Sequence, residues 1–221
     1  MSDLPIVKLD VKRWVGAEEY DDKGRLKPVL AVYPWWTNSK LIAHAARLGF
    51  VGGPGEHWCD LTWGRGVWWR HHCPGVLTPF SGNFLECPFP DDTFDGTTYD
   101  PPYVSMGGRK TSGLADFMDR YGLEEAPKDP VALQELINLG VEQAVRITRP
   151  GGRVLQKSCD YISSGKLQVG TYWTRQHAYS LGLEEECHFI LPGSARAQPR
   201  GRRQVHPRNN YSTLFVFRVP K

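Results

Sequence analysis

Two acidic residues stand in sequence contexts that could give them a chemical role. Asp100 opens the tetrapeptide Asp100-Pro101-Pro102-Tyr103, directly after the β-rich run FDGTTY. The prolines remove backbone donors and fix φ, so a strand must end there, and the rigid turn presents a carboxylate beside an aromatic ring. Asp60 opens the pattern Asp60-x-x-x-Gly64-x-Gly66 after a short apolar run. Such glycines let a backbone turn sharply and approach a ligand closely. The pattern differs from the G-x-G-x-x-G fingerprint, which disfavours NAD.

The two motifs together resemble those of the amino-methylating DNA methyltransferases, which modify adenine N6 or cytosine N4. The likeness covers roughly residues 30–221. It includes the stretches DLTWGRGVWW, ITRPGGRVLQKSCDY and RRQVHPRNNYSTLFVFR, which are similar to small DNA methylases of bacteriophages and bacteria. The resemblance implies S-adenosylmethionine as the cofactor, with its amino-acid end on the glycine loop.

The chemistry of that family explains the residue types. An exocyclic amine is a poor nucleophile because its lone pair is delocalised into the base. The resemblance implies that the Asp100 carboxylate and the Pro101 carbonyl accept its N–H groups, so that the nitrogen can attack the sulfonium methyl in line. This is catalysis by positioning and electrostatics. The base must be flipped out of the duplex, and Tyr103 offers a ring for stacking worth roughly 1–3 kcal/mol.

The resemblance also implies a set of cofactor-binding residues. Thr37 and Asn38 match the segment that borders the methionine site, although helix capping explains them equally well. Phe84 is a candidate for packing against the cofactor's adenine, with a role in the core as the alternative. The family commonly has an acid for the ribose hydroxyls after the second strand, where VLTPFSG offers none, and often has Asp where this chain has Asn83. The expected cofactor-binding residues are Asp60, Thr62, Gly64, Gly66, Thr37, Asn38, Asn83 and Phe84.

Contact with DNA is expected from two polar segments. The formal net charge is +3, but residues Cys187 to Lys221 contain seven Lys or Arg and no Asp or Glu. An acid-free basic segment predicts a face that meets a polyanion, although a solvated basic loop would have the same composition. The expected DNA-contacting residues are Arg109, Lys110, Arg196, Arg200, Arg202, Arg203, His206, Arg208, Asn210 and Tyr211.

Length and composition predict one soluble globular domain. The chain has 221 residues, of which 40% are hydrophobic and 23% charged. Residues 1–33 are expected to form an N-terminal extension, and 104–128 and 192–210 to be loops that contact DNA. The start, MSDLPIVKLD, lacks the regions of a signal peptide, and no run is long enough for a membrane span. A cytoplasmic location, in a bacterial cell or a phage-infected host, is expected, with no membrane partner.

The five cysteines contain no C-x-x-C pair, and the His/Cys cluster around residues 57–73 fits no familiar zinc spacing. Reduced, buried cysteines and no metal site are therefore expected.

The order of elements predicts a Rossmann-like methyltransferase fold, which is a mainly parallel, doubly wound α/β sheet with an antiparallel strand pair late in the chain. Strands are expected at 56–61, 75–80, 82–87, 94–100, 185–191 and 212–219, and residues 149–161 are expected to form a turn that leads into a buried strand. Helices are expected at 37–49, directly after Gly66, at 129–147 and at 164–181.

Adenine N6 in double-stranded DNA is the favoured target, because Asp rather than Ser opens the tetrapeptide. Cytosine N4 and RNA bases stay open as targets, since the geometry around a flipped base is shared. Glutamine methylation is less favoured, because enzymes of that kind prefer Asn at the first position. A non-catalytic nucleic-acid-binding subunit with the same fold is the alternative from another class.

Overall fold

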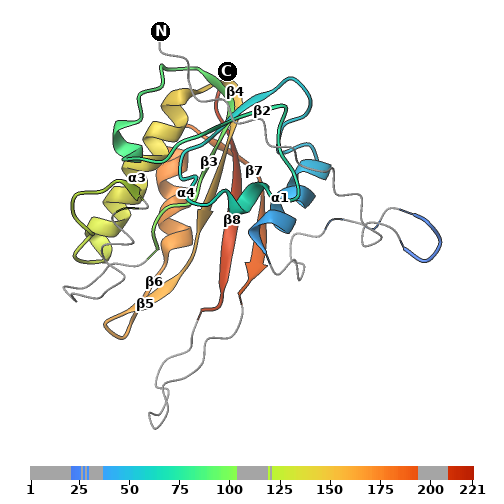
Figure 1. Ribbon diagram of the computed structural model, residues 1–221. Coiled ribbons are helices and arrows are strands. Elements are labelled where there is room, and N and C mark those ends of the chain that lie inside the picture. Colours follow the sequence, from blue (N-terminus) through green and yellow to red (C-terminus); the bar gives the residue numbers. More distant parts are fainter. Residues whose placement is uncertain are drawn as a thin grey trace.

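The computed structural model describes residues 21–25, 27, 29, 37–103, 119, 121–193 and 209–221. A six-stranded sheet in the order β2-β1-β3-β4-β8-β7 forms the centre of the protein (Figure 1). Its strands are β1 (His57–Asp60), β2 (Val76–Pro79), β3 (Phe94–Tyr99), β4 (Thr148–Ser158), β7 (Glu184–Pro192) and β8 (Tyr211–Arg218). A separate hairpin consists of β5 (Tyr161–Ser163) and β6 (Lys166–Gln168).

Strand directions confirm the predicted fold class. β1 pairs in parallel with both β2 and β3, and β3 pairs in parallel with β4. β8 runs antiparallel to both β4 and β7, which makes the late antiparallel pair. The fold is a Rossmann-like α/β fold with a mostly parallel sheet.

Helices cover both faces of the sheet, as a doubly wound sheet requires (Figure 1). One hydrophobic cluster joins α3 (Pro130–Ile147) and α4 (Gly170–Ser180) to strand residues such as Val154 and Phe215. A second cluster joins α1 (Asn38–Arg47) and the 3₁₀ turn η2 (Val67–Trp69) to Trp58 and Leu155. In β1, β4 and β8, successive buried residues therefore enter opposite cores.

Two of the predicted helix starts, at Thr37 and Asp129, are confirmed by their caps. The Thr37 hydroxyl accepts a hydrogen bond from the Lys40 N–H at the start of α1. At the start of α3, the Asp129 carboxylate accepts from the N–H groups of Val131 and Ala132, and Pro130 takes the first helical position.

Three predicted elements were wrong. Residues 82–87 contain the 3₁₀ turn η3 (Phe84–Glu86) in place of a strand, because the Asn83 side chain accepts from the Leu85 N–H and turns the backbone. Only the short η2 follows Gly66, where an α-helix was expected. The helix expected from 164 begins at Gly170, because Ser164 and Gly165 adopt positive φ and close the β5–β6 hairpin.

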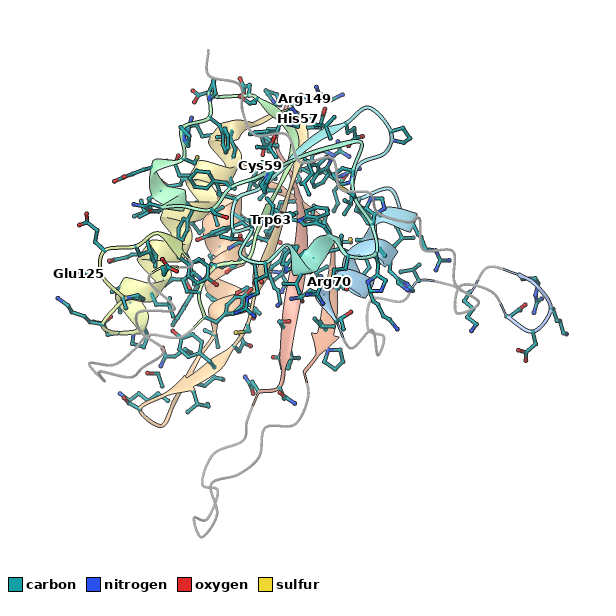
Figure 2. All side chains as sticks on the ribbon, viewed as in Figure 1. His57, Cys59, Trp63, Arg70, Glu125 and Arg149 are labelled. Carbon is teal, nitrogen blue, oxygen red and sulfur yellow. The ribbon has the colours of Figure 1, made fainter. Side chains whose placement is uncertain are left out.

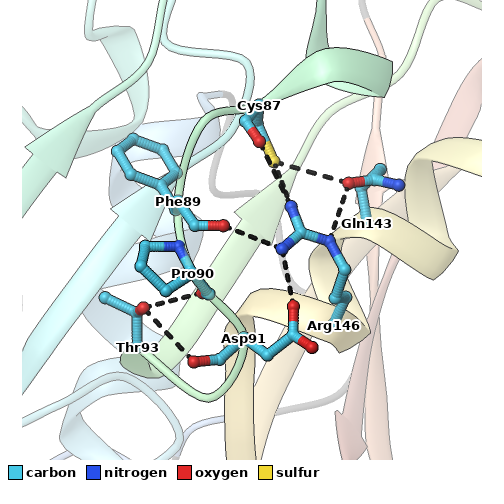
Figure 3. A network of polar contacts seen from close by, with 7 residues as sticks. All are labelled: Cys87, Phe89, Pro90, Asp91, Thr93, Gln143 and Arg146. Carbon is cyan, nitrogen blue, oxygen red and sulfur yellow. Dashed lines mark hydrogen bonds and ion pairs between the residues drawn. The ribbon is translucent and has the colours of Figure 1, made fainter.

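Arg146, in the last turn of α3, fastens the segment between η3 and β3 to the helix (Figure 3). Its guanidinium donates to the carbonyl oxygens of Cys87 (3.2 Å) and Phe89 (2.8 Å). It also forms an ion pair with Asp91 at 2.8 Å. One side chain thereby satisfies backbone acceptors in a segment without regular structure, which fixes the entry into β3.

We expect Arg146→Met to lower the free energy of unfolding by about 2 kcal/mol, because the carbonyl oxygens of Cys87 and Phe89 lose their donor. Denaturant unfolding followed by circular dichroism measures this. Arg70→Met, at an exposed position, is the matched control. Equal stability of the two variants would contradict the proposed anchoring role of Arg146.

Candidate active site

The two acidic motifs meet where the order of the sheet reverses. β1 lies between β2 and β3. The chain continues from β1 to β2 on one side and then crosses to β3 on the other side. In open α/β sheets, ligands bind outside the carboxyl ends of the strands at such a switch point. Asp60 ends β1 and Asp100 directly follows β3. The parallel strands β1, β3 and β4 run from the end marked by His57 and Arg149 in Figure 2 toward the end where Trp63 and Arg70 lie.

Asp60 is a buried acid with both oxygens bound. The residue is only 4% exposed to solvent. One oxygen accepts from the Thr62 N–H at 3.1 Å and the other from the Trp69 indole N–H at 2.7 Å. The hydrogen bond from the Thr62 N–H shows that Asp60 also stabilises the turn after β1. Further lone pairs of the carboxylate stay available to a ligand.

Asp100 is tied to the glycine loop through both its backbone and its side chain. Its N–H donates to the Thr62 hydroxyl at 2.8 Å. The Trp68 indole N–H donates to Asp100 Oδ2 at 3.2 Å. The Tyr103 hydroxyl donates to Oδ1, so the acid and the ring of the tetrapeptide are in direct contact. Burial raises the pKa of Tyr103 well above its ordinary value and the Asp100 charge raises it further, so this hydroxyl stays a donor.

Trp68 and Trp69 are core residues whose indole N–H groups also bind the two acids, a contact that the sequence did not predict. The consecutive indoles, at 5% and 1% exposure, lie in the core on one face of the sheet. Trp69 donates to Asp60, which ends β1, and Trp68 donates to Asp100, which follows β3. The pair of tryptophans directly after a glycine loop was the available sequence signal.

Lys157 lies near the end of β4, where the sequence allows either a place at the border of the site or a structural ion pair. Tyr99 pairs with Gln156 in register, so the next residues, Asp100 and Lys157, are neighbours. The Lys157 ammonium lies 3.8 Å from Asp100 Oδ1 and 5.6 Å from the centroid of the Tyr103 ring, over its face. A cation, a carboxylate and an aromatic ring therefore meet at one point of the sheet edge.

The two glycines of the loop differ in their surroundings. Both adopt left-handed φ, 52° at Gly64 and 62° at Gly66, which explains their presence. A Cβ on Gly66 would meet the Trp63 ring at 2.5 Å, whereas the nearest atom to a Cβ on Gly64 would be the Thr62 carbonyl oxygen at 3.9 Å. Open space therefore lies beside Gly64, where a ligand could approach the backbone.

The N-terminus of α1 lies beside the segment that follows the glycine loop, because Ser39 Oγ is 2.8 Å from His71 Nδ1. Thr37 acts as the helix cap. The side-chain oxygen of Asn38 is buried, and no described residue forms a hydrogen bond with it. Such an acceptor fits an ammonium group supplied by a ligand.

Asn83 and Phe84 have structural roles in the described state. Asn83 caps η3. The Phe84 ring is fully buried and packs edge-on against Tyr99 and Tyr121, with ring centroids at 5.3 and 6.2 Å. The core alternative holds for Phe84, and its contact with a cofactor stays a prediction.

The predicted DNA-contacting residues divide into two groups. Asn210 donates to the Gly193 carbonyl, and the Tyr211 hydroxyl donates to Asp160, whose other oxygen binds Thr171 at the start of α4. The rest, Arg109, Lys110, Arg196, Arg200, Arg202, Arg203, His206 and Arg208, lie outside the described residues, as does most of the segments 1–33, 104–128 and 192–210.

Burial raises the pKa of Asp60 to about 6, although the hydrogen bonds from Trp69 and Thr62 oppose the shift. The folded state therefore binds a proton more tightly than the unfolded state does. As pH rises from the unfolded-state pKa of this carboxyl to its folded-state pKa, the free energy of unfolding of the protein falls. Above about pH 6 this decrease is complete.

We expect Asp60→Asn to become more stable relative to wild type as pH rises from 4 to 8. The difference in unfolding free energy should grow by about 3 kcal/mol, the equivalent of the shift at roughly 1.4 kcal/mol per pKa unit. Denaturant unfolding of both proteins at several pH values measures it. A pH-independent difference would show that Asp60 has an ordinary pKa.

Among the described residues, no group of three or more His, Cys, Asp or Glu side chains is placed to hold a metal ion. Within the same part of the chain, no helix is long and apolar enough to cross a membrane.

No protein-family model matches the chain, and no curated protein matches it. Solved structures resemble it at low identity. A candidate DNA modification methylase from Thermus thermophilus, solved with S-adenosyl-L-methionine, is 13% identical with a TM-score of 0.42, over 75% of this chain and 56% of that one. The cytosine-N4-specific PvuII DNA methyltransferase is 13% identical with a TM-score of 0.44, over 65% of this chain and 50% of that one. The MccD protein is 12% identical with a TM-score of 0.48, over 81% and 96%. The chain thus spans about half the length of the two DNA methylases.

Proposed function

We propose that the chain transfers a methyl group from S-adenosylmethionine to the exocyclic amine of a flipped base in DNA, with adenine N6 favoured. The observation that carries the proposal is the juxtaposition of the two motifs. Thr62 of the glycine loop binds the backbone of Asp100, and consecutive tryptophans bind Asp60 and Asp100. A cofactor loop and an amine acceptor are thereby held at one switch point.

The residues around the glycine loop fit the cofactor. The space beside Gly64 admits a ligand close to the backbone, and the buried Asn38 oxygen could accept from the ammonium of the methionine moiety. Asp60 adds a buried carboxylate next to that loop. When bound, S-adenosylmethionine supplies the electrophilic methyl group.

Asp100 has the properties of an amine acceptor that is oriented before the substrate arrives. Its carboxylate is 27% exposed, while Trp68 and Tyr103 hold one oxygen each. A carboxylate has about four lone-pair sites, so it can accept an N–H of the base in addition. Fixed acceptors of this kind cost no reorganisation during the reaction. The Pro101 carbonyl provides the second acceptor in this proposal, and the Tyr103 ring the stacking surface.

DNA as the substrate is supported by the charge of the basic segment between β7 and β8 and by the position of the strand ends that it connects. Pro192 at the end of β7 pairs with Tyr211 at the start of β8. β7 runs in the same direction as β4. The carboxyl end of β7 therefore lies at the same end of the sheet as Lys157. The chain between these strands holds five arginines and no acid over residues 194–208. Arginines bind phosphates and can read base edges.

The first test is methyl transfer from labelled S-adenosylmethionine to duplex DNA, single-stranded DNA and RNA, followed by separation of the methylated nucleosides. We expect N6-methyladenine from duplex DNA. Asp100→Ala should lower the rate about 100-fold or more, because the oriented acceptor is lost. Asp22→Ala, at an exposed acid, is the matched control.

The products separate the alternatives. N4-methylcytosine as the product would identify cytosine as the target base in place of adenine. Methylated RNA would identify RNA as the substrate in place of DNA. Cofactor binding without transfer to any of the three would reject the enzyme and favour a non-catalytic subunit.

A second test concerns the cofactor loop. Gly64→Ala should weaken S-adenosylmethionine binding about tenfold or more, because the added methyl group enters the open space, while the left-handed φ costs about 1 kcal/mol of stability. Gly66→Ala is the contrast, since its methyl group meets Trp63 and should mainly lower stability. Calorimetric binding and thermal unfolding measure the two effects. Unchanged binding in Gly64→Ala would place the cofactor elsewhere.

A further inference from the structure

The Lys157 ammonium has unused hydrogen-bonding capacity at the centre of the candidate site. The residue is only 9% exposed. Its distance of 3.8 Å from Asp100 Oδ1 is an ion pair but exceeds a hydrogen bond. Among the described residues, no hydrogen bond from this ammonium is formed; its other contact is the Tyr103 ring. An ammonium has three donors, so this little-exposed group can donate hydrogen bonds to an acceptor that a ligand brings.

The position of Lys157 puts a donor next to an acceptor. Asp100 can only accept when ionised, and Lys157 can only donate. A ligand that satisfies both must present a donor beside an acceptor. The 6-amino group of adenine has this form, because its neighbours N1 and N7 are unprotonated ring nitrogens, and so has the 4-amino group of cytosine beside N3.

We propose that Lys157 is a specificity-determining residue that donates a hydrogen bond to the ring nitrogen beside the amine held by Asp100. The inference rests on the proposed function and extends it, since it assigns recognition of the base edge to this chain's own side chains. Lys157 lies over the face of the Tyr103 ring, the surface on which the base would stack. Asp100 and Lys157 together select bases in which an amine adjoins an unprotonated ring nitrogen.

This role differs from that of a simple counter-ion for Asp100. A counter-ion would act through the charge of the carboxylate, and its loss would slow transfer to every substrate equally. A donor to the base senses one atom of the substrate. Removing that atom and removing the lysine must then have effects that do not add, because both remove the same hydrogen bond.

The experiment compares duplex oligonucleotides that carry adenine, 7-deazaadenine or 1-deazaadenine at the methylated position. Wild type, Lys157→Met and Lys157→Arg are assayed for methyl transfer, with Lys166→Met at an exposed lysine as the matched control. Thermal unfolding identifies any variant that fails to fold. Wild type should lose roughly 10- to 100-fold on one of the two analogues, the range for a hydrogen bond to a charged group.

In Lys157→Met the same analogue should be methylated as fast as adenine, while Lys157→Arg should keep part of the discrimination. The control should behave as wild type. An equal loss on the analogue in wild type and Lys157→Met, or no loss on either analogue in wild type, would overturn the inference while leaving the proposed function intact. Absence of transfer to natural DNA would instead reject the proposed function, and the inference with it.

Discussion

The site depends on the hydrogen bonds that consecutive indole N–H groups donate to two carboxylates. An acid that loses water must gain donors, or it becomes protonated. Trp69 provides a donor for Asp60 and Trp68 one for Asp100, from a single 3₁₀ turn. Because both donors belong to one rigid segment, the ends of β1 and β3 are held in a fixed relation.

The remaining parts of the fold complete this arrangement from the other side. The register of β3 with β4 brings Lys157 next to Asp100, and the cap of α1 lies beside the segment that follows the loop. The hydrophobic clusters on the two faces bury the strands between their ends, and Asp60, Asp100 and Lys157 lie at the carboxyl ends. These charged groups therefore lie where a ligand could enter.

This organisation agrees with a reaction that needs positioning more than covalent chemistry. Asp100 is oriented by a tryptophan, a tyrosine and a lysine before any substrate is present. Preorganised polar groups lower a barrier because they do not have to reorient as charge develops. Asp60, in contrast to Asp100, is buried at a cost: at neutral pH its burial lowers the free energy of unfolding. Groups with pKa values shifted by burial are common at functional sites.

The sequence by itself determined the fold class, the helix starts at Thr37 and Asp129, and the two acidic motifs, because caps, prolines and glycines act through neighbouring residues. It did not determine the turn at residues 82–87 or the hairpin before α4, where local hydrogen bonds and positive φ outweighed the apolar pattern. Only the tertiary structure revealed the partners of Trp68, Trp69 and Lys157. Their partners lie 9 to 57 residues away in the chain, so strand register and packing decided contacts that no local spacing encodes.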